Sequence, residues 1–157
     1  DHGWQLGEHN LWAKHCNFQT SLRVPLLIRL PGQSEGHMVS SMAELTDLYP
    51  TLCSIAGLQK PAHLEGTDLG PVLGLLGGAG RRSAFSKFHG GETVTTEMYS
   101  YTEFKNRKTG EPAGEMMFDL TKDPDENTNV VSEPEYSQIK LALSSQLDSL
   151  RRPSNRP

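Results

Sequence analysis

Residues 1–32 read DHGWQLGEHNLWAKHCNFQTSLRVPLLIRLPG and join two stretches of opposite character. The first fifteen residues hold three His, two Trp, one Asp, one Glu and one Lys, and their glycines at positions 3 and 7 indicate a loop. Residues 24–30 are almost continuously apolar and end at Pro31-Gly32. That run predicts a short strand buried on both faces, as in a parallel sheet. We therefore expect a polar loop over residues 1–15, a short helical turn within residues 17–22, and then a buried strand.

The composition limits the classes of protein to which the chain can belong. Its 157 residues suffice for one modest domain with a core. A net charge of −4, with no long basic run, gives nucleic-acid binding little support. No apolar run reaches the roughly 18 residues that a membrane span needs. The chain shows neither an initiating Met nor a signal peptide, so we expect a fragment or a processed product. Cys16 and Cys53 are expected to be free thiols.

Residues 46–56 show the spacing of an amphipathic helix. Their apolar positions fall on one stripe, Pro50 fits the first turn, and Gly57 stands where a glycine ends a helix. Residues 59–82 are rich in Gly and Pro and indicate a link. We therefore predict a boundary near residue 80, with one region over 1–80 and a second over 81–157.

The second region predicts a small sheet and a helix. Residues 83–88, 92–104 and 114–120 contain aromatic and β-branched residues in partial alternation, which predicts three short antiparallel strands joined by turns such as 108–110. An Asp/Asn/Pro-rich turn follows. Residues 133–150 then have the apolar spacing of an amphipathic helix. The residues alone thus indicate an α+β chain.

The opening stretch holds the candidate site. Asp1 and His2 are adjacent, and Asp supplies oxygen to a hard cation whereas His more often binds zinc, copper or iron. The spacings of His2, His9 and His15 match no zinc-ligand pattern. Lys14, taken alone, is typical of a solvated cation. Neither a nucleophile elbow nor a Walker loop occurs in the chain.

Four stretches together resemble one known family. DHGWQLGEHNLWAKHCNF (1–18), followed by RVPLLIRLPG (23–32), resembles the second metal-binding segment of the sulfatases, and is closest to their iduronate sulfatase branch. ELTDLYPTLCSIAGL (44–58), LEGTDLGPVL (64–73) and EMMFDLTKDPDENTNVV (115–131) resemble later sulfatase elements in the same order. The resemblance covers about residues 1–150.

The resemblance implies both a fold and a set of site residues. The fold would be α/β: the C-terminal part of an alkaline-phosphatase-like sulfatase fold, ending in a small antiparallel sheet with a C-terminal helix. Asp1 and His2 would bind Ca2+. Because a His nitrogen is an unusual ligand for Ca2+, another divalent ion is the alternative. Lys14 would contact the sulfate ester and stabilise its developing negative charge. Trp4 and His9 would line the sugar pocket; the alternatives are a packing anchor for Trp4 and a loop hydrogen-bonder for His9.

The chain departs from the family pattern in one major respect. Neither Cys16 nor Cys53 lies in a C-x-P-x-R motif, so no formylglycine can form here. The formylglycine nucleophile and the other Asp ligands are expected in a missing N-terminal half, which would be the partner of this chain. The complete protein would hydrolyse sulfate esters of an iduronate-type glycosaminoglycan or another sulfated polysaccharide, whereas this chain alone would be inactive. The alternative is a truncated, non-catalytic relative that acts as a binding or structural module. Sulfatases are lysosomal, extracellular or periplasmic.

Overall fold

The computed structural model describes residues 2–74 and 80–151. The chain divides into two compact units, one of Asp1–Leu27 with Phe85–Pro157 and the other of Ile28–Ala84. This grouping differs from a boundary near residue 80, because the first 27 residues belong with the C-terminal sheet. The physical reason is a set of hydrogen bonds that ties residues 17 and 19 to strands more than 70 positions later.

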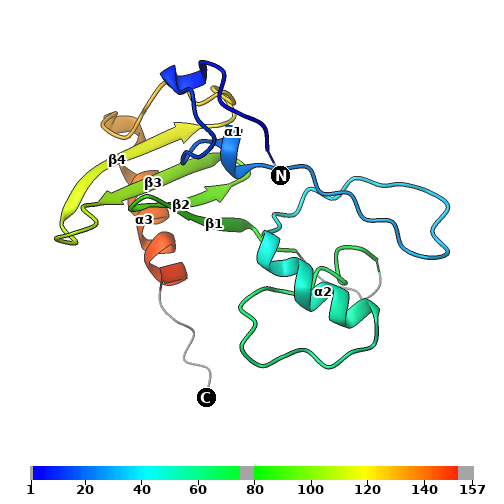
Figure 1. Cartoon of the computed structure of the whole chain (residues 1–157). Helices are drawn as coiled ribbons and strands as arrows, with labels where there is room; N and C mark the ends of the chain where they lie inside the picture. The colour runs from blue at the N-terminus through cyan, green and yellow to red at the C-terminus, as the bar shows by residue number, and fades with distance from the viewer. Residues whose placement is uncertain (1, 75–79, 152–157) are drawn as a thin grey trace. The chain divides into compact units, whose positions relative to one another are not determined.

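The first unit is built on a four-stranded sheet in the order β1 (Ser83–Phe88), β2 (Gly91–Thr96), β3 (Tyr99–Lys105), β4 (Pro112–Asp119) (Figure 1). β2, β3 and β4 pair in an antiparallel manner. The small antiparallel sheet predicted from the sequence is therefore present, with four strands rather than three. The predicted strand over residues 92–104 is two strands, because the chain turns at residues 97–98 and the Tyr99 N–H donates to the Thr96 hydroxyl at 2.9 Å.

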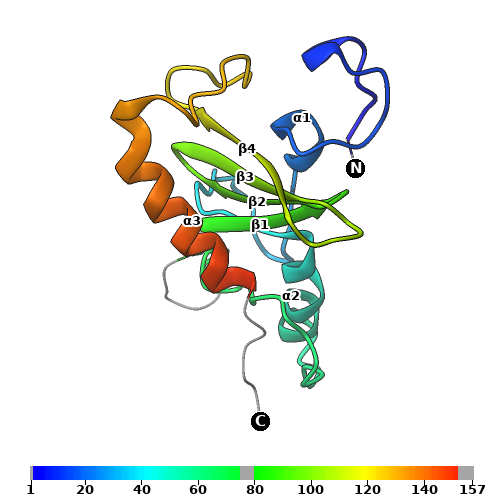
Figure 2. The same cartoon turned by 90° about the vertical axis from the view of Figure 1, so that its left-hand side faces the viewer.

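One face of this sheet packs against the C-terminal helix. α3 (Ser137–Arg151) follows a 3-10 turn, η3 (Pro134–Tyr136), and lies along the sheet (Figure 2). The predicted helix over residues 133–150 is confirmed. The core of this face is fully or almost fully buried, and it consists of Val94, Tyr101, Met117, Tyr136, Leu143 and Leu147. In the described part of the chain, no helix is long and apolar enough to cross a membrane.

The opposite face of the sheet is polar, yet it is buried as well. The Thr93 and Thr102 hydroxyls hydrogen-bond each other at 2.8 Å, and neither residue is exposed. The N-terminal residues cover this face: the Phe18 ring lies 5.7 Å from the Phe118 ring. Because these two hydroxyls bond each other, the pair can be buried without an orphaned hydrogen-bond donor.

The second unit contains one helix stabilised by a buried carboxylate. η2 (Leu45–Asp47) leads into α2 (Leu48–Ile55), and Gly57 follows with a φ of 66°, as expected for a glycine that ends a helix. Asp47 is fully buried; its carboxylate accepts hydrogen bonds from Arg81 at 2.7 Å and from the Thr67 N–H at 2.6 Å. These bonds tie the start of α2 to the chain that follows it.

Most of the apolar stripe predicted on this helix is exposed, although Leu48 is half-buried. We call it the α2 face: its exposed fractions are 68% for Leu45, 54% for Tyr49, 61% for Leu52, 38% for Ile55 and 64% for Leu58. A run of large apolar side chains at helical spacing normally covers a neighbouring element. Within the residues described, no such element lies over these side chains.

The strand predicted at residues 24–30 is wrong. No residue of that stretch is in a strand, and Leu27 is 89% exposed, although Leu30 is buried at 6%. A strand of a parallel sheet needs neighbours that complete its backbone hydrogen bonds. The described sheet of residues 83–119 provides none, because its strands pair only with one another.

Candidate functional site

The candidate site residues lie on a folded-back loop, residues 2–18, which we call the N-terminal segment. The Gln5 N–H donates to the Ala13 carbonyl at 2.8 Å, and the Gly7 N–H donates to the Leu11 carbonyl at 3.0 Å. A 3-10 turn, η1 (Glu8–Asn10), closes the loop, and His9 there adopts a left-handed φ of 53°. This pairing brings residues 4 and 14 opposite each other, although ten positions separate them.

The loop places the candidate sulfate contact beside a candidate metal ligand. The Lys14 Nζ donates a hydrogen bond to the His2 carbonyl oxygen at 2.9 Å, and both side chains are half-buried. The bond fixes the ammonium at the start of the chain, twelve positions away in sequence. Asp1 lies outside the described residues.

The described residues do not form a complete metal site. None of their His, Cys, Asp and Glu side chains form a group of three or more that could hold a metal ion. His2 is the predicted ligand that the structure describes, and Ca2+ takes about six to eight oxygen ligands. A calcium site would therefore need most of its donors from elsewhere.

Two indole side chains project from the same loop into solvent. Trp4 is 67% exposed and Trp12 is 75% exposed. The Trp12 ring lies against Gly7, where a Cβ would sit 3.6 Å from its edge. Exposed aromatic rings offer the flat apolar faces on which sugar rings can stack. Sequence reasoning selected Trp4 but not Trp12, although the folding back of a loop around residues 8–10 would have put residue 12 near residue 6.

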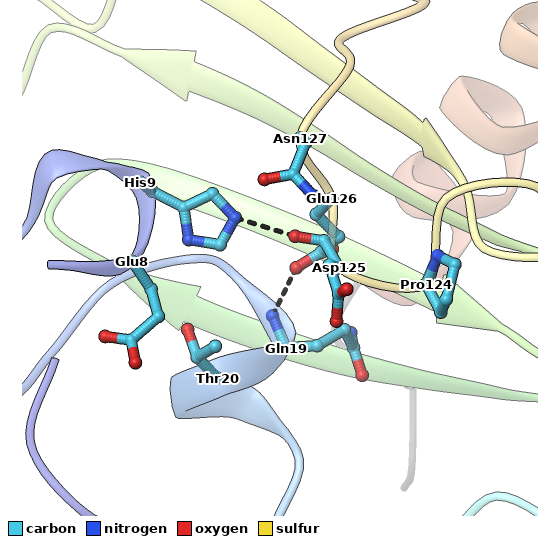
Figure 3. Close-up of a pocket in the computed structure, with 8 residues that line it drawn as sticks. All are labelled: Glu8, His9, Gln19, Thr20, Pro124, Asp125, Glu126 and Asn127. Atoms are coloured by element: carbon cyan, nitrogen blue, oxygen red, sulfur yellow. Dashed lines mark hydrogen bonds between the residues drawn. The ribbon is translucent and has the colours of Figure 1, made fainter. Parts of the chain in front are cut away.

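His9 is held by a hydrogen bond at one ring nitrogen and by stacking on one ring face, rather than projecting freely. Its Nε2 hydrogen-bonds the Asp125 carbonyl at 2.9 Å, and its ring stacks on Phe18 with centroids 3.8 Å apart and planes 6° apart. The residue lines a cavity of about 370 Å3, together with Gln19, Asp125 and Glu126 (Figure 3). His9 thus joins the N-terminal segment to residues 123–128, which we call the acidic turn.

Glu126, in the acidic turn, is the residue of this region that sequence reasoning missed. It is only 2% exposed and has a left-handed φ of 55°. Its Oε2 accepts a hydrogen bond from the Gln19 N–H at 2.5 Å, at the start of α1 (Gln19–Leu22), a helical turn predicted within residues 17–22 (Figure 3). Burial raises the pKa of Glu126, although the Gln19 N–H and the Ser100 hydroxyl partly offset this rise. A buried carboxylate that accepts a backbone N–H has the geometry of a structural anchor.

Comparison with known proteins identifies a matching family and several similar sulfatases. The family model for the C-terminal region of N-sulphoglucosamine sulphohydrolase matches residues 7–153. Arylsulfatase K of Xenopus laevis is 35% identical over 150 residues, which cover 88% of this chain and 28% of that protein. Delta 4,5-hexuronate-2-O-sulfatase of Bacteroides thetaiotaomicron is 32% identical over 154 residues, which cover 88% of this chain and 31% of that protein.

A solved structure extends the likeness to the fold. The structure of BT4656 in complex with D-glucosamine-2-N,6-O-disulfate superposes with a TM-score of 0.74 at 24% identity, and covers 94% of this chain and 32% of that one. The chain thus spans less than a third of the length of these three proteins. Because the family model covers the sheet, α3 and most of the N-terminal segment, the chain belongs to the sulfatase family, in the alkaline-phosphatase-like superfamily, as a C-terminal sulfatase domain.

Proposed function

We propose that this chain provides the C-terminal part of a sulfuric ester hydrolase that acts on sulfated sugars, with 2-O-sulfated uronates of glycosaminoglycans as the leading substrate class. The observation that carries the proposal is the bond from the Lys14 Nζ to the His2 carbonyl, which brings the predicted sulfate contact and a predicted metal ligand together. The name of one relative, a hexuronate-2-O-sulfatase 32% identical to this chain, supports the substrate class.

In this proposal Lys14 holds the sulfate group by charge. Its ammonium is a fixed positive charge at a place where negative charge grows on the transferring group and on the leaving oxygen. The hydrogen bond to the His2 carbonyl orients the side chain in advance, which reduces the reorganisation needed when the ester reacts. Trp4 offers an exposed ring to the sugar. His9 lines a cavity and is held there by its hydrogen bond to the Asp125 carbonyl.

The rest of the site is assigned to an N-terminal portion of a longer protein. Asp1 and His2 would contribute a share of the ligands of a divalent cation, since the described residues hold no metal-binding group of three. The formylglycine would come from a C-x-P-x-R motif, which this chain lacks. The exposed α2 face and the exposed Leu27 support such a partner, because both offer apolar surface that a neighbouring part of a larger fold would cover.

The test is the activity of a longer protein that joins a C-x-P-x-R segment to this chain. We expect it to release sulfate from a 2-O-sulfated unsaturated uronic acid disaccharide, and faster than from the same disaccharide sulfated at C6 of the hexosamine. A folded longer protein that hydrolyses neither disaccharide, nor an aryl sulfate, would contradict the proposal. If it bound sulfated saccharides without turnover, the chain would instead be a binding module.

A further inference from the structure

Glu126 is a buried carboxylate that the proposed chemistry does not use. Its partner, the Gln19 N–H, is 107 positions away in sequence. Burying a carboxylate is unfavourable unless hydrogen bonds compensate, and a left-handed φ adds backbone strain in a residue other than glycine. Glu126 shows both features. A strained conformation of this kind persists only where the surrounding contacts determine it, and the contacts of Glu126 reach the N-terminal segment.

The acidic turn is itself well fixed. The Asp123 carboxylate accepts hydrogen bonds from the Thr128 N–H at 2.7 Å and from the Asn127 side chain at 3.4 Å. The Asp123 N–H donates to the Asp119 carbonyl at 2.8 Å, at the end of β4. The turn therefore has a defined position on the sheet from which Glu126 can hold another segment.

The contacts of the acidic turn converge on the end of the N-terminal segment. Glu126 accepts from the Gln19 N–H, while the Asp125 carbonyl bonds His9, whose ring stacks on Phe18. Two further bonds reach the sheet directly: Gln19 Nε2 donates to the Thr95 hydroxyl at 3.3 Å, and Asn17 Nδ2 donates to the Phe88 carbonyl at 3.1 Å.

A second set of bonds carries this anchoring on to Lys14. α1 begins at Gln19, and Ser21 in the same turn donates its hydroxyl to the Lys14 carbonyl at 2.8 Å. The Ser21 oxygen in turn accepts from Gln5 Nε2 at 3.0 Å. A continuous chain of contacts therefore runs from Glu126 through α1 to both arms of the folded-back loop.

We propose that Glu126 is a positioning residue, whose carboxylate fixes the start of α1 and thereby sets the place of Lys14 and Trp4 on the sheet. The structural part of this inference stands on the contacts themselves, and only its consequence for sulfate hydrolysis rests on the proposed function. Removing the acceptor should loosen the N-terminal segment while leaving the packing of α3 on the other face intact.

The test is amide hydrogen exchange on the 157-residue chain, at a concentration where it is monomeric, and again on the longer protein. Glu126→Leu leaves the partly buried Gln19 N–H without its carboxylate acceptor, so amides in residues 4–22 should exchange about tenfold faster. Glu126→Gln keeps a carbonyl acceptor and should retain most of the protection. Glu92→Gln is the matched control, because Glu92 pairs with Arg151 of α3 at 2.5 Å and lies outside these contacts.

The outcomes separate the inference from the proposed function. Unchanged exchange in residues 4–22 of Glu126→Leu, or an equal acceleration in β2, β3 and this segment, would overturn the positioning role. If Glu126→Leu fails to fold, Ser21→Ala interrupts the same path and should loosen the loop around Lys14 but not β2.

In the longer protein, Glu126→Leu should lower kcat more than it raises KM, with recovery in Glu126→Gln. Loss of protection without any sulfatase activity in the wild type would refute the proposed function alone.

Discussion

Lys14 shows how the role of one side chain depends on residues far away in the sequence. Its type and its place in the sulfatase-like motif could be predicted. The Ser21 hydroxyl that holds its backbone carbonyl, and the bond from the acidic turn to the start of α1, could not be predicted. Glu126 left no local signal, because a Glu in a polar turn has the same sequence pattern whether it is exposed or buried. Asp1, predicted as a ligand, lies outside the described residues.

Lys14→Ala in the longer protein should lower kcat/KM strongly. Loss of one preorganised electrostatic contact typically lowers kcat by about 100- to 1,000-fold. Lys14→Arg should recover little, since a planar guanidinium does not replace a compact ammonium in a tight site. Steady-state kinetics beside thermal unfolding would check this. Near-normal kcat/KM in Lys14→Ala would mean that Lys14 does not contact the sulfate; the replacement of a mere surface lysine changes stability by only about 0.5 kcal/mol.

Glu126→Gln should also change how stability depends on pH. The pKa of Glu126 is raised above its ordinary value of 4.5, so the native state keeps a proton that the unfolded state has already released. The free energy of unfolding therefore falls as pH rises from the ordinary value through the raised one. Glu126→Gln has no carboxyl group to ionise and should not lose stability in this way. The melting temperature of Glu126→Gln, relative to that of the wild type, should therefore rise as pH increases over that window. Parallel curves for the two proteins from pH 4 to about 8 would show that the carboxylate is not destabilised by burial.

Individual elements were predictable where the decisive pattern is local. The helix over residues 46–56 and the helix over 133–150 follow from apolar spacing and from end signals such as Gly57. The separation of β2 from β3 was missed because residues 97–98 contain neither Gly nor Pro. The strand predicted at residues 24–30 failed because a strand also needs a partner, and hydrophobicity alone does not provide one.

The α2 face makes a prediction at the scale of one helix. Leu52→Glu should leave the melting temperature of the 157-residue chain nearly unchanged and increase its solubility, because Leu52 is 61% exposed. In the longer protein the same change should impair folding or assembly, since the proposed partner would bury a charge. Leu147→Ala is the contrasting variant: Leu147 is fully buried, and its truncation should cost about 2–5 kcal/mol in either protein. A large loss of stability in the isolated Leu52→Glu chain would contradict the exposed position.

At the scale of the whole molecule, the sulfatase resemblance correctly predicted the family, the small antiparallel sheet and the C-terminal helix. It did not predict that residues 1–27 form one unit with that sheet. The bonds responsible join residues up to 107 positions apart, and such contacts leave no periodicity in the sequence.

The isolated chain should not hydrolyse sulfate esters. It lacks a C-x-P-x-R motif, and its described residues form no metal-binding group of three. The purified 157-residue protein should therefore release no sulfate above background from an aryl sulfate or a sulfated disaccharide, with or without added Ca2+. The longer protein in the same assay is the positive control. Turnover by the 157-residue chain that disappears in Lys14→Ala would show that this chain holds the whole active site. It would refute the proposal that an N-terminal portion supplies the nucleophile and the other metal ligands.

The long reach of the Gln19–Glu126 bond has a consequence during protein synthesis. A ribosome adds about 5–20 residues per second, so the 107 positions between the two residues take about 5–20 seconds to make. For that interval the loop that carries Lys14, with its two exposed indoles, has emerged while its anchor does not yet exist. Folding of this unit can therefore be completed only after the acidic turn has been translated, and until then the two indoles and Lys14 lie on a loop without its anchor.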